Sequence, residues 1–187
     1  MSAVQVFQID DAEYQISELQ PDSTEHLQRL FEQCADYALI VEGEGVSPAA
    51  AKESFESVPP GRALNDKFLY GVLDRKGNIV GVLEGMRHYP DETTWWIGLL
   101  MLAPTTRGRG LGRTLIEAFS DYVRTQQGLS IMLGVVEENH DAYHFWQQVG
   151  FELVRETEPR VFGKKTQKVY VMRRDLIQEN LQRTTAG

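Results

Sequence analysis

Along this chain, apolar residues either alternate with polar ones or form short continuous runs, patterns typical of β-strands with one or both faces buried. The predicted strands cover residues 4–9, 14–19, 68–73, 79–86, 93–102, 129–136, 154–162 and 168–174. The first two predict a hairpin or one bent strand. The last two predict a late hairpin that turns around Gly163, Lys164 and Lys165. A turn over residues 74–78 joins the third and fourth strands.

Helical spacing of apolar residues separates these strands in three places. The first helix follows a predicted capping box at residues 22–25. It carries an apolar stripe made up of Leu27, Leu30, Phe31 and Cys34. A second helix is predicted from Ser47 to just before Pro59, after an acidic loop over residues 41–46. A third is predicted over residues 114–124.

Length and composition narrow the class of protein. A chain of 187 residues with strands and helices in alternation predicts one α/β domain over residues 1–187, built on a mixed sheet. The formal charge of −8 argues against a nucleic-acid partner, and no apolar run is long enough to cross a membrane. The single cysteine excludes an internal disulfide, and the first residues lack the features of a signal peptide, so a cytoplasmic protein is expected. The histidines lack the pattern of a metal site, and no metal is expected.

A glycine-rich segment, RGRGLG over residues 107–112, lies between a predicted strand and a predicted helix. This order places backbone N–H groups and a helix N-terminus around an anion, and glycine lets the backbone approach a ligand. A Walker phosphate loop does not fit, because its first glycine would be Arg107 and its lysine Arg113. A dinucleotide fingerprint does not fit either, because the third glycine comes one residue too early. The pattern that fits is Arg-x-x-Gly-x-Gly, from Arg107, Gly110 and Gly112.

Preceded by Leu102, Ala103 and Pro104, this loop resembles the acetyl-coenzyme A loop of the GNAT N-acetyltransferase superfamily. A second match follows the next predicted strand. It consists of an Asn-x-x-Ala segment that opens a helix, at Asn139 and Ala142, followed by a Gly-Phe pair at residues 150–151. The two matches come in the family's order and at its spacing, and the resemblance covers roughly residues 79–176.

The resemblance implies a fold and a cosubstrate. The fold is a mixed, mostly antiparallel central sheet with helices on both faces. The sheet is splayed between the strands at 93–102 and 129–136, where the pantetheine arm of acetyl-coenzyme A would enter. The implied reaction is transfer of an acetyl group from acetyl-coenzyme A to a primary amine of a small molecule or peptide.

The implied cofactor contacts come from three segments. Loop N–H groups would bind the pyrophosphate, with Arg107 and Arg113 favoured for side-chain contact and Arg109 left open. Backbone groups of residues 100–102 would pair with pantetheine. Asn139 would bond to the same arm, with three neighbours on its helix face. The predicted cofactor-binding residues are Leu100, Met101, Leu102, Arg107, Gly108, Arg109, Gly110, Leu111, Gly112, Arg113, Thr114, Asn139, Ala142, Tyr143 and Trp146.

The sequence defines the general acid and the general base of this reaction less clearly than the cofactor contacts. Many relatives carry a tyrosine where this chain has Trp146, and an indole N–H is not a usable acid. Tyr143, one turn earlier, is the candidate substitute, although it could equally be a packing aromatic. The nearest candidate bases are Glu84 and Glu137, and a base acting through ordered water needs neither. Glu137 could also cap the helix of Asn139.

The amine pocket is expected between the first two helices, the loop between them and the late hairpin. Its candidate residues are Asp36, Tyr37, Glu42, Glu44, Tyr89, Trp95, Trp96 and Phe162. Carboxylates with aromatic rings suit an ammonium group. A second hypothesis is a module that binds acyl-coenzyme A as a sensor or docking unit with little or no transferase activity. Exposed strand edges could support a homodimer.

Overall fold

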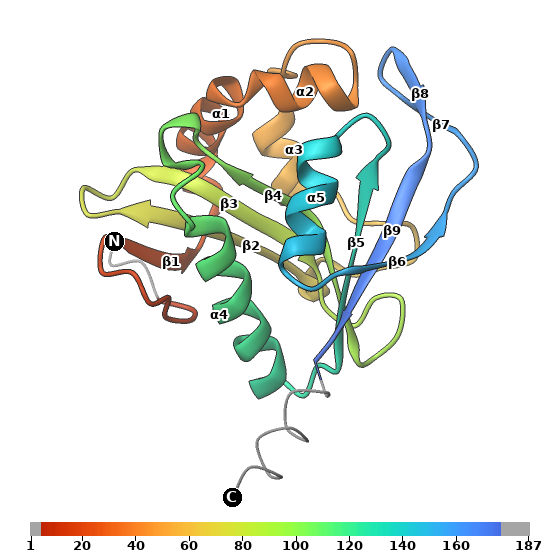
Figure 1. Cartoon of the computed structure of the whole chain (residues 1–187). Coiled ribbons are helices and arrows are strands. Elements are labelled where there is room, and N and C mark those ends of the chain that lie inside the picture. Colours follow the sequence, from red (N-terminus) through yellow and green to blue (C-terminus); the bar gives the residue numbers. More distant parts are fainter. Residues whose placement is uncertain (1–4, 177–187) are drawn as a thin grey trace, which may run out of the picture.

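The computed structural model describes residues 5–176, in which a seven-stranded sheet carries helices on both faces (Figure 1). The strand order is β1-β2-β3-β4-β5-β9-β6. The strands are β1 (Tyr14–Glu18), β2 (Lys67–Asp74), β3 (Ile79–Met86), β4 (Thr94–Leu102), β5 (Ser130–Val136), β6 (Glu152–Glu156) and β9 (Val169–Asp175). Only β4 and β5 run parallel, and the other neighbours pair antiparallel. The expected mixed, mostly antiparallel sheet is confirmed.

Helices cover the two faces of this sheet with separate apolar cores. On one face lie α4 (Leu111–Thr125) and α5 (His140–Gln148), and on the other lie α1 (Thr24–Gln33) and α3 (Ala50–Glu56). A fifth helix, α2 (Ala35–Val41), follows α1 directly. Three short 3-10 turns complete the list: η1 (Pro21–Ser23), η2 (Leu64–Asp66) and η3 (Pro104–Thr106).

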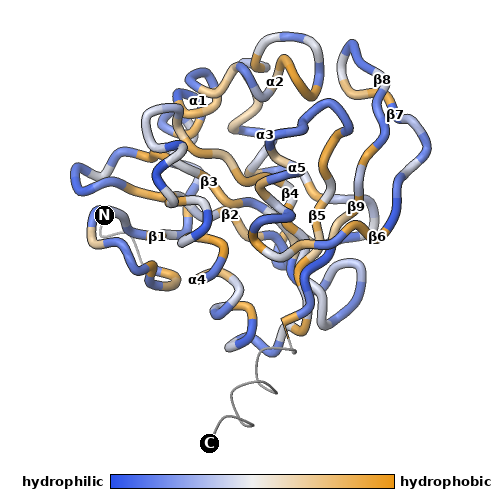
Figure 2. Tube along the Cα trace, viewed as in Figure 1, coloured by the Kyte–Doolittle hydropathy of each residue, from blue (hydrophilic) through white to orange (hydrophobic). Residues whose placement is uncertain are grey.

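The longest helix, α4, is held to the sheet by a continuous apolar stripe. Leu111, Leu115, Ile116, Phe119 and Val123 recur at helical spacing and are all buried. Burying each such side chain stabilises the fold by about 1.5–3 kcal/mol. Figure 2 shows the corresponding alternation of hydrophobic and hydrophilic segments along this helix. The stripe fixes the N-terminus of α4, and with it the glycine-rich loop, against the sheet.

The parallel pair β4–β5 is joined over only part of its length. Pairing runs from Thr94 opposite Ser130 to Ile97 opposite Leu133, while β4 continues to Leu102 against β3 alone. The register between β3 and β4 shifts at Gly98, the residue that follows the last paired position. The expected splay between these two strands is therefore present.

The N-terminal expectations are corrected in two places. Residues 4–9 do not form a strand: Gln5 makes one isolated bridge to Ser17, and Val4 lies outside the described residues. The predicted capping box does not form, since Ser23 makes no side-chain cap. Thr24 Oγ1 instead donates to the carbonyl of Pro21 at 2.7 Å, because a 3-10 turn precedes α1.

The segment after α1 is a helix of its own. The chain bends at Cys34 (φ −103°, ψ 31°), and α2 then runs to Val41 in a new direction. The next helix, α3, begins at Ala50 rather than Ser47, whose hydroxyl accepts a hydrogen bond from the backbone N–H of Ala49.

The late hairpin is nested rather than simple. β6 pairs with β9, and a second small hairpin, β7 (Arg160–Phe162) with β8 (Lys165–Gln167), is inserted between them. The turn at Gly163 (φ +54°) lies against Glu42, which follows α2. The inserted hairpin therefore contacts the end of α2.

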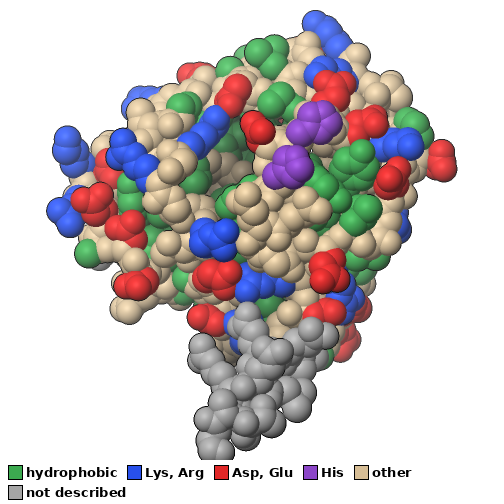
Figure 3. Space-filling model, viewed as in Figure 1, with side chains coloured by type: hydrophobic (Ala, Val, Ile, Leu, Met, Phe, Trp, Pro, Cys, Tyr) green, Lys and Arg blue, Asp and Glu red, His purple; other side chains and the backbone are tan. Residues whose placement is uncertain are grey.

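Charge is mixed over the surface. On the face seen in Figure 3, acidic and basic side chains are interspersed, and neither sign gathers into one patch. No helix within residues 5–176 has the length and apolar character needed to cross a bilayer. The same residues contain no group of three or more potential metal ligands.

Candidate active site

The glycine-rich loop forms a cradle of unused donors. Gly108 (φ +72°) and Gly110 (φ +87°) both adopt the left-handed conformation that favours glycine, and Gly110 is the N-cap of α4. Among the described residues, none of the backbone N–H groups from Arg107 to Arg113 donates a hydrogen bond within the chain. Seven unpaired donors at the N-terminus of a 15-residue helix make a site for a phosphate group.

Gly112 has a different role from the other two loop glycines. A Cβ at Gly112 would lie 3.2 Å from Cζ of Phe145, on α5. The absence of a side chain therefore lets α5 pack closely on the start of α4. This contact links the loop to the helix that carries the second family match.

The side chain of Arg107 is directed to protein partners. Its Nε donates to the Leu102 carbonyl at 2.8 Å, and its two terminal nitrogens contact the carboxylate of Asp36 at 2.5 and 3.2 Å. The hydrogen bond from Arg107 lowers the pKa of Asp36. The side chain of Arg107, which the sequence favoured for phosphate contact, is therefore engaged within the protein, and only its backbone N–H remains unpaired. The exposed side chains of Arg109 and Arg113 form no ion pair within residues 5–176.

A cleft of about 110 Å³ opens where β4 and β5 part. It is lined by Tyr37, Val41, Ile97, Gly98, Leu99, Leu100, Leu133, Gly134, Val135, Val136, Asn139, Ala142 and Trp146. Its walls come from both strands, from α5 and from α2. A narrow channel between parted strands, lined by apolar side chains and by polar backbone groups, fits an extended arm that carries amide groups.

Backbone direction selects Leu100 on the β4 wall. The N–H of Ala103 donates to Val80 on β3, so Leu102, one residue earlier, directs its backbone groups away from β3. Leu100, two residues before Leu102, faces the same way and lines the cleft. The carbonyl of Leu102 is already bonded to Arg107, and Met101 faces the opposite side. Leu100 is therefore the best-placed of the three residues expected to pair with pantetheine.

Helix α5 presents three of its four expected residues to the cleft. Asn139 caps the helix, with its Oδ1 accepting from the N–H of Ala142 at 3.2 Å, which leaves its NH₂ group as a donor. Ala142 and Trp146 line the cleft beside it. Tyr143 does not: its ring packs edge-on against Tyr170 of β9, with centroids 5.1 Å apart. The geometry therefore favours packing for Tyr143.

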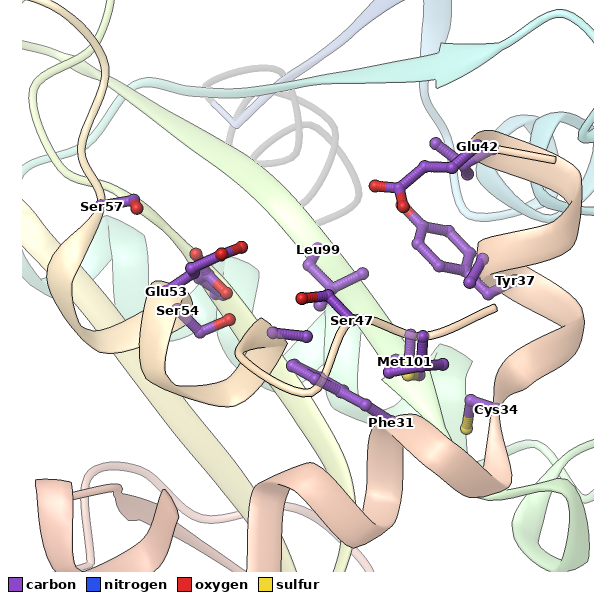
Figure 4. Close-up of a pocket in the computed structure, with 15 residues that line it drawn as sticks. Phe31, Cys34, Tyr37, Glu42, Ser47, Glu53, Ser54, Ser57, Leu99 and Met101 are labelled. Carbon is purple, nitrogen blue, oxygen red and sulfur yellow. The ribbon is translucent and has the colours of Figure 1, made fainter. Parts of the chain in front are cut away.

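A larger cavity, of about 300 Å³, lies on the α1–α2–α3 side of β4 (Figure 4). Its lining residues are Phe31, Cys34, Tyr37, Ala38, Val41, Glu42, Val46, Ser47, Ala50, Glu53, Ser54, Ser57, Glu84, Leu99 and Met101. Glu42 lies beside Tyr37 at one side of the cavity and Glu53 at the other, with Leu99 and Met101 between them (Figure 4). We call this space the acceptor cavity.

The two candidate bases have different surroundings. Glu84 lines the acceptor cavity but is ion-paired with Lys67, with Oε1 and Nζ 2.6 Å apart. Glu137 does not line it: its Oε1 accepts from the backbone N–H of Lys168 at 2.9 Å. Of the two candidate bases, only Glu84 therefore lies in the wall of this cavity.

Most other pocket candidates lie elsewhere. Trp95 is a core residue and is 1% exposed, because its strand position faces α4. Trp96 packs edge-on against Tyr89. Asp36 is bound by Arg107, Glu44 pairs with Lys164, and Phe162 belongs to β7, outside the cavity lining. The cavity instead contains Glu53, which lies on α3 and which the sequence reasoning missed.

The cleft and the acceptor cavity share three lining residues: Tyr37, Val41 and Leu99. The site therefore consists of two spaces that are joined at these residues. One is the narrow cleft, and the other is a cavity with acidic side chains in its wall. Sequence reasoning named Tyr37 only as one of several pocket aromatics. No sequence signal singled it out, because the ion pair that anchors its helix joins Asp36 to Arg107, 71 positions away.

Comparison with known families decides the classification. The model of the Acetyltransferase (GNAT) family matches residues 4–151. The chain belongs to the GNAT family. Its match covers every element from β1 to α5, so the loop and the Asn139 segment both fall within the GNAT region. No curated protein sequence matches the chain.

Solved structures share the GNAT fold with this chain. An acetyltransferase from Thermus thermophilus superposes with a TM-score of 0.69 at 21% identity, covering 92% of this chain and 99% of the other. A spermidine N-acetyltransferase from Vibrio cholerae, in complex with CoA and spermine, gives 0.64 at 19% identity, covering 89% and 97%. A GNAT-family acetyltransferase from Bacillus anthracis gives 0.67 at 12% identity, covering 90% and 98%. At these identities the likeness shows the fold alone.

Proposed function

We propose that this protein transfers an acetyl group from acetyl-coenzyme A to a primary amine, by direct attack of the amine within a ternary complex. The observation that carries the proposal is the meeting of two spaces at Tyr37, Val41 and Leu99. A cofactor channel and an acceptor cavity that join at one point bring two reactants together in a fixed orientation.

The cosubstrate would be held by the loop and the cleft. Backbone N–H groups of residues 107–113 would bind the pyrophosphate, with Arg109 and Arg113 adding positive charge. The backbone of Leu100 and the free NH₂ group of Asn139 would bond to the pantetheine arm. Bound there, acetyl-coenzyme A supplies an acetyl thioester whose carbonyl carbon accepts the amine.

The acceptor cavity suits a cationic amine with a second positive charge. Glu42 and Glu53 form no ion pair within residues 5–176 and lie at opposite sides of an apolar strip formed by Leu99 and Met101. Two carboxylates separated by apolar surface match two ammonium groups joined by methylene groups. The relative from Vibrio cholerae that was solved with CoA and spermine has a ligand of this type.

A second candidate is an acyl-coenzyme A sensor without transferase activity. Trp146 stands where many relatives have the tyrosine acid, and Glu84 is tied to Lys67. Such a module would still need the loop and the cleft. Turnover separates the two candidates.

The test is release of coenzyme A thiol from acetyl-coenzyme A with a panel of diamines, polyamines, aminoglycosides, amino acids and short peptides. We expect saturable release with diamines or polyamines and less with amines that carry a single charge. Release by every amine in proportion to its free-base concentration would contradict a specific acceptor site. No release, with coenzyme A raising the melting temperature, would favour the sensor.

A further inference from the structure

Tyr37 is the one side chain that the acceptor cavity and the cofactor cleft share and that carries an ionisable polar group. The other two shared residues, Val41 and Leu99, are apolar. The phenol oxygen of Tyr37 makes no hydrogen bond within residues 5–176. In Figure 4 its ring lies in the cavity wall, next to Glu42.

The helix that carries Tyr37 is fixed at both ends. At its start, Asp36 is bound by Arg107, which belongs to the cofactor loop. At its end, the carbonyl of Ile40 accepts from Lys165 Nζ at 3.1 Å and from Gln167 Nε2 at 3.0 Å, and the carbonyl of Val41 accepts from Gln167 Nε2 at 2.8 Å. Tyr37 is therefore held in place relative to the loop on one side and to β8 on the other.

Neither Trp146 nor Tyr143, the tryptophan and the tyrosine of α5, can pass a proton between the two spaces. Trp146 lines the cleft only, and its indole N–H does not act as an acid. Tyr143 lines neither space and packs on Tyr170. The residue that lies between the two spaces and can exchange a proton is therefore Tyr37, on α2.

We propose that Tyr37 is a catalytic residue of this site, which passes a proton from the attacking amine to the departing sulfur. This inference rests on the proposed acetyl transfer. It assigns a residue to the step in which the adduct breaks down and the C–S bond is cleaved.

The atoms balance in one exchange. The neutral amine nitrogen forms a bond to the thioester carbon, and the resulting adduct carries N⁺–H and O⁻. As the C–S bond breaks and the carbonyl re-forms, the phenol O–H gives its proton to sulfur and accepts the proton on nitrogen. The products are an N-acetyl amine and coenzyme A thiol, and Tyr37 ends in its starting state.

The surroundings of Tyr37 favour a concerted proton relay, in which the phenol stays neutral, over a mechanism that forms a tyrosinate. Burial raises the pKa of Tyr37 to about 12, and the negative charges of Glu42 and Glu84 act in the same direction. The phenol is therefore neutral and a donor throughout the neutral pH range. A relay in which the phenol gains a proton as it loses one avoids the tyrosinate that this environment opposes.

The first test needs no amine. Binding of coenzyme A and of desulfo-coenzyme A is measured for the wild type and for Tyr37→Phe. The pH is set about one unit above the ordinary pKa of a thiol, which is about 8.5. A phenol that contacts the sulfur should favour the thiolate. We expect the ratio of the two dissociation constants to shift by about tenfold in Tyr37→Phe, as for loss of a hydrogen bond to a charged group. An unchanged ratio would overturn the proposal.

The second test is turnover with the most active amine of the panel. Tyr37→Phe should lower kcat by about 100-fold, with the KM for acetyl-coenzyme A within about twofold of wild type. Tyr143→Phe is the matched control and should change kcat by less than about twofold. A Tyr37→Phe enzyme with wild-type kcat, or a large loss in Tyr143→Phe alone, would contradict the relay. If the wild type binds neither form of coenzyme A, the proposed function itself fails.

Discussion

Tyr37, Glu84 and Cys34 line the same cavity, yet their surroundings give them different chemistry. Burial keeps the Tyr37 phenol protonated, and the ammonium of Lys67 engages the carboxylate of Glu84. Cys34 donates to the carbonyl of Leu102 at 3.4 Å and is buried at the bend between α1 and α2. Residue type alone would have made the cysteine the nucleophile of this group, and its environment argues against that role.

Cys34 should react slowly with thiol reagents in the native protein. Burial raises the pKa of its thiol, although Arg107 acts in the opposite direction, so less thiolate is present at neutral pH than in the unfolded chain. We expect the rate with a chromogenic disulfide to be at least about tenfold lower in the native than in the denatured protein, and to rise as pH increases. Equal rates in the two states would contradict the buried, protonated thiol.

Glu84→Gln tests whether this carboxylate is the base. The ammonium of Lys67 already occupies this carboxylate, with the two charged atoms 2.6 Å apart, so we expect kcat to stay within about tenfold of wild type, whereas a true base contributes about 100-fold or more. The KM for the amine should rise, because Lys67 then leaves the cavity more positive. If turnover instead slowed by about 100-fold or more, Glu84 would be identified as the base.

At the scale of elements, α2 is the piece that joins the parts of the site. It has only seven residues, too few to be stable alone, and it is held by Arg107 at its start and by Gln167 at its end. Gln167 is fully buried and donates to the carbonyls of Ile40 and Val41, which the helix leaves unpaired.

Gln167→Ala should destabilise the protein and misplace α2. Leaving the Val41 carbonyl without a donor, and the Ile40 carbonyl with Lys165 alone, should lower the free energy of unfolding by about 1–3 kcal/mol, measured by urea denaturation. Lys164→Ala, which removes an exposed pair with Glu44, is the control and should cost less than about 1 kcal/mol. Equal losses in the two variants would show that the buried amide does not hold the helix.

The elements were predictable from the sequence to different degrees. The strands β2 to β5 and the helix α4 were predicted close to their bounds, because apolar runs, alternation and helical stripes report directly which residues are buried. The separate helix α2 was not, since its residues bury no continuous stripe and its break at Cys34 depends on packing against Leu102. The start of α5 near Asn139 was expected from the family resemblance, whereas the cap that Asn139 itself forms was not predicted.

The site was only partly predictable for a related reason. The loop glycines act through local backbone conformation, so the motif located them. The ion pair of Arg107 with Asp36 joins residues 71 positions apart, and neither residue's neighbours indicate it. Trp95 was predicted as a pocket residue but faces the core, because the one-residue choice of strand face cannot be made from the paired tryptophans.

At the scale of the whole molecule, negative charge would attract the amine, and positive charge at the glycine-rich loop would attract acetyl-coenzyme A. The chain carries a formal charge of −8, to which Glu42 and Glu53 of the acceptor cavity contribute. Residues 107–113 carry unpaired N–H groups, and Arg109 and Arg113 form no ion pair within residues 5–176. A cationic amine and an anionic cosubstrate would therefore approach surfaces of opposite sign.

Salt should weaken the use of a cationic amine. The Debye length falls from about 30 Å at 0.01 M to about 10 Å at 0.1 M, which screens attraction between the amine and the acidic surface. We expect kcat/KM for a diamine to fall as salt is raised over this range, mainly through KM. The effect should be smaller in Glu53→Gln. A kcat/KM that does not change with salt would argue against electrostatic recognition of the amine.

The measurement that tests the account most directly is a calorimetric titration of acetyl-coenzyme A into the wild type and Gly110→Asp. We expect saturable binding by the wild type, in the micromolar to millimolar range of about 1 μM to 1 mM. We expect none by Gly110→Asp, which places a carboxylate among the N–H groups of the loop. Gly77→Asp, at another left-handed glycine with open space around it in the β2–β3 turn, should bind normally. Wild-type affinity in Gly110→Asp, or no binding by the wild type, would contradict the cofactor site and the acetyl transfer built on it.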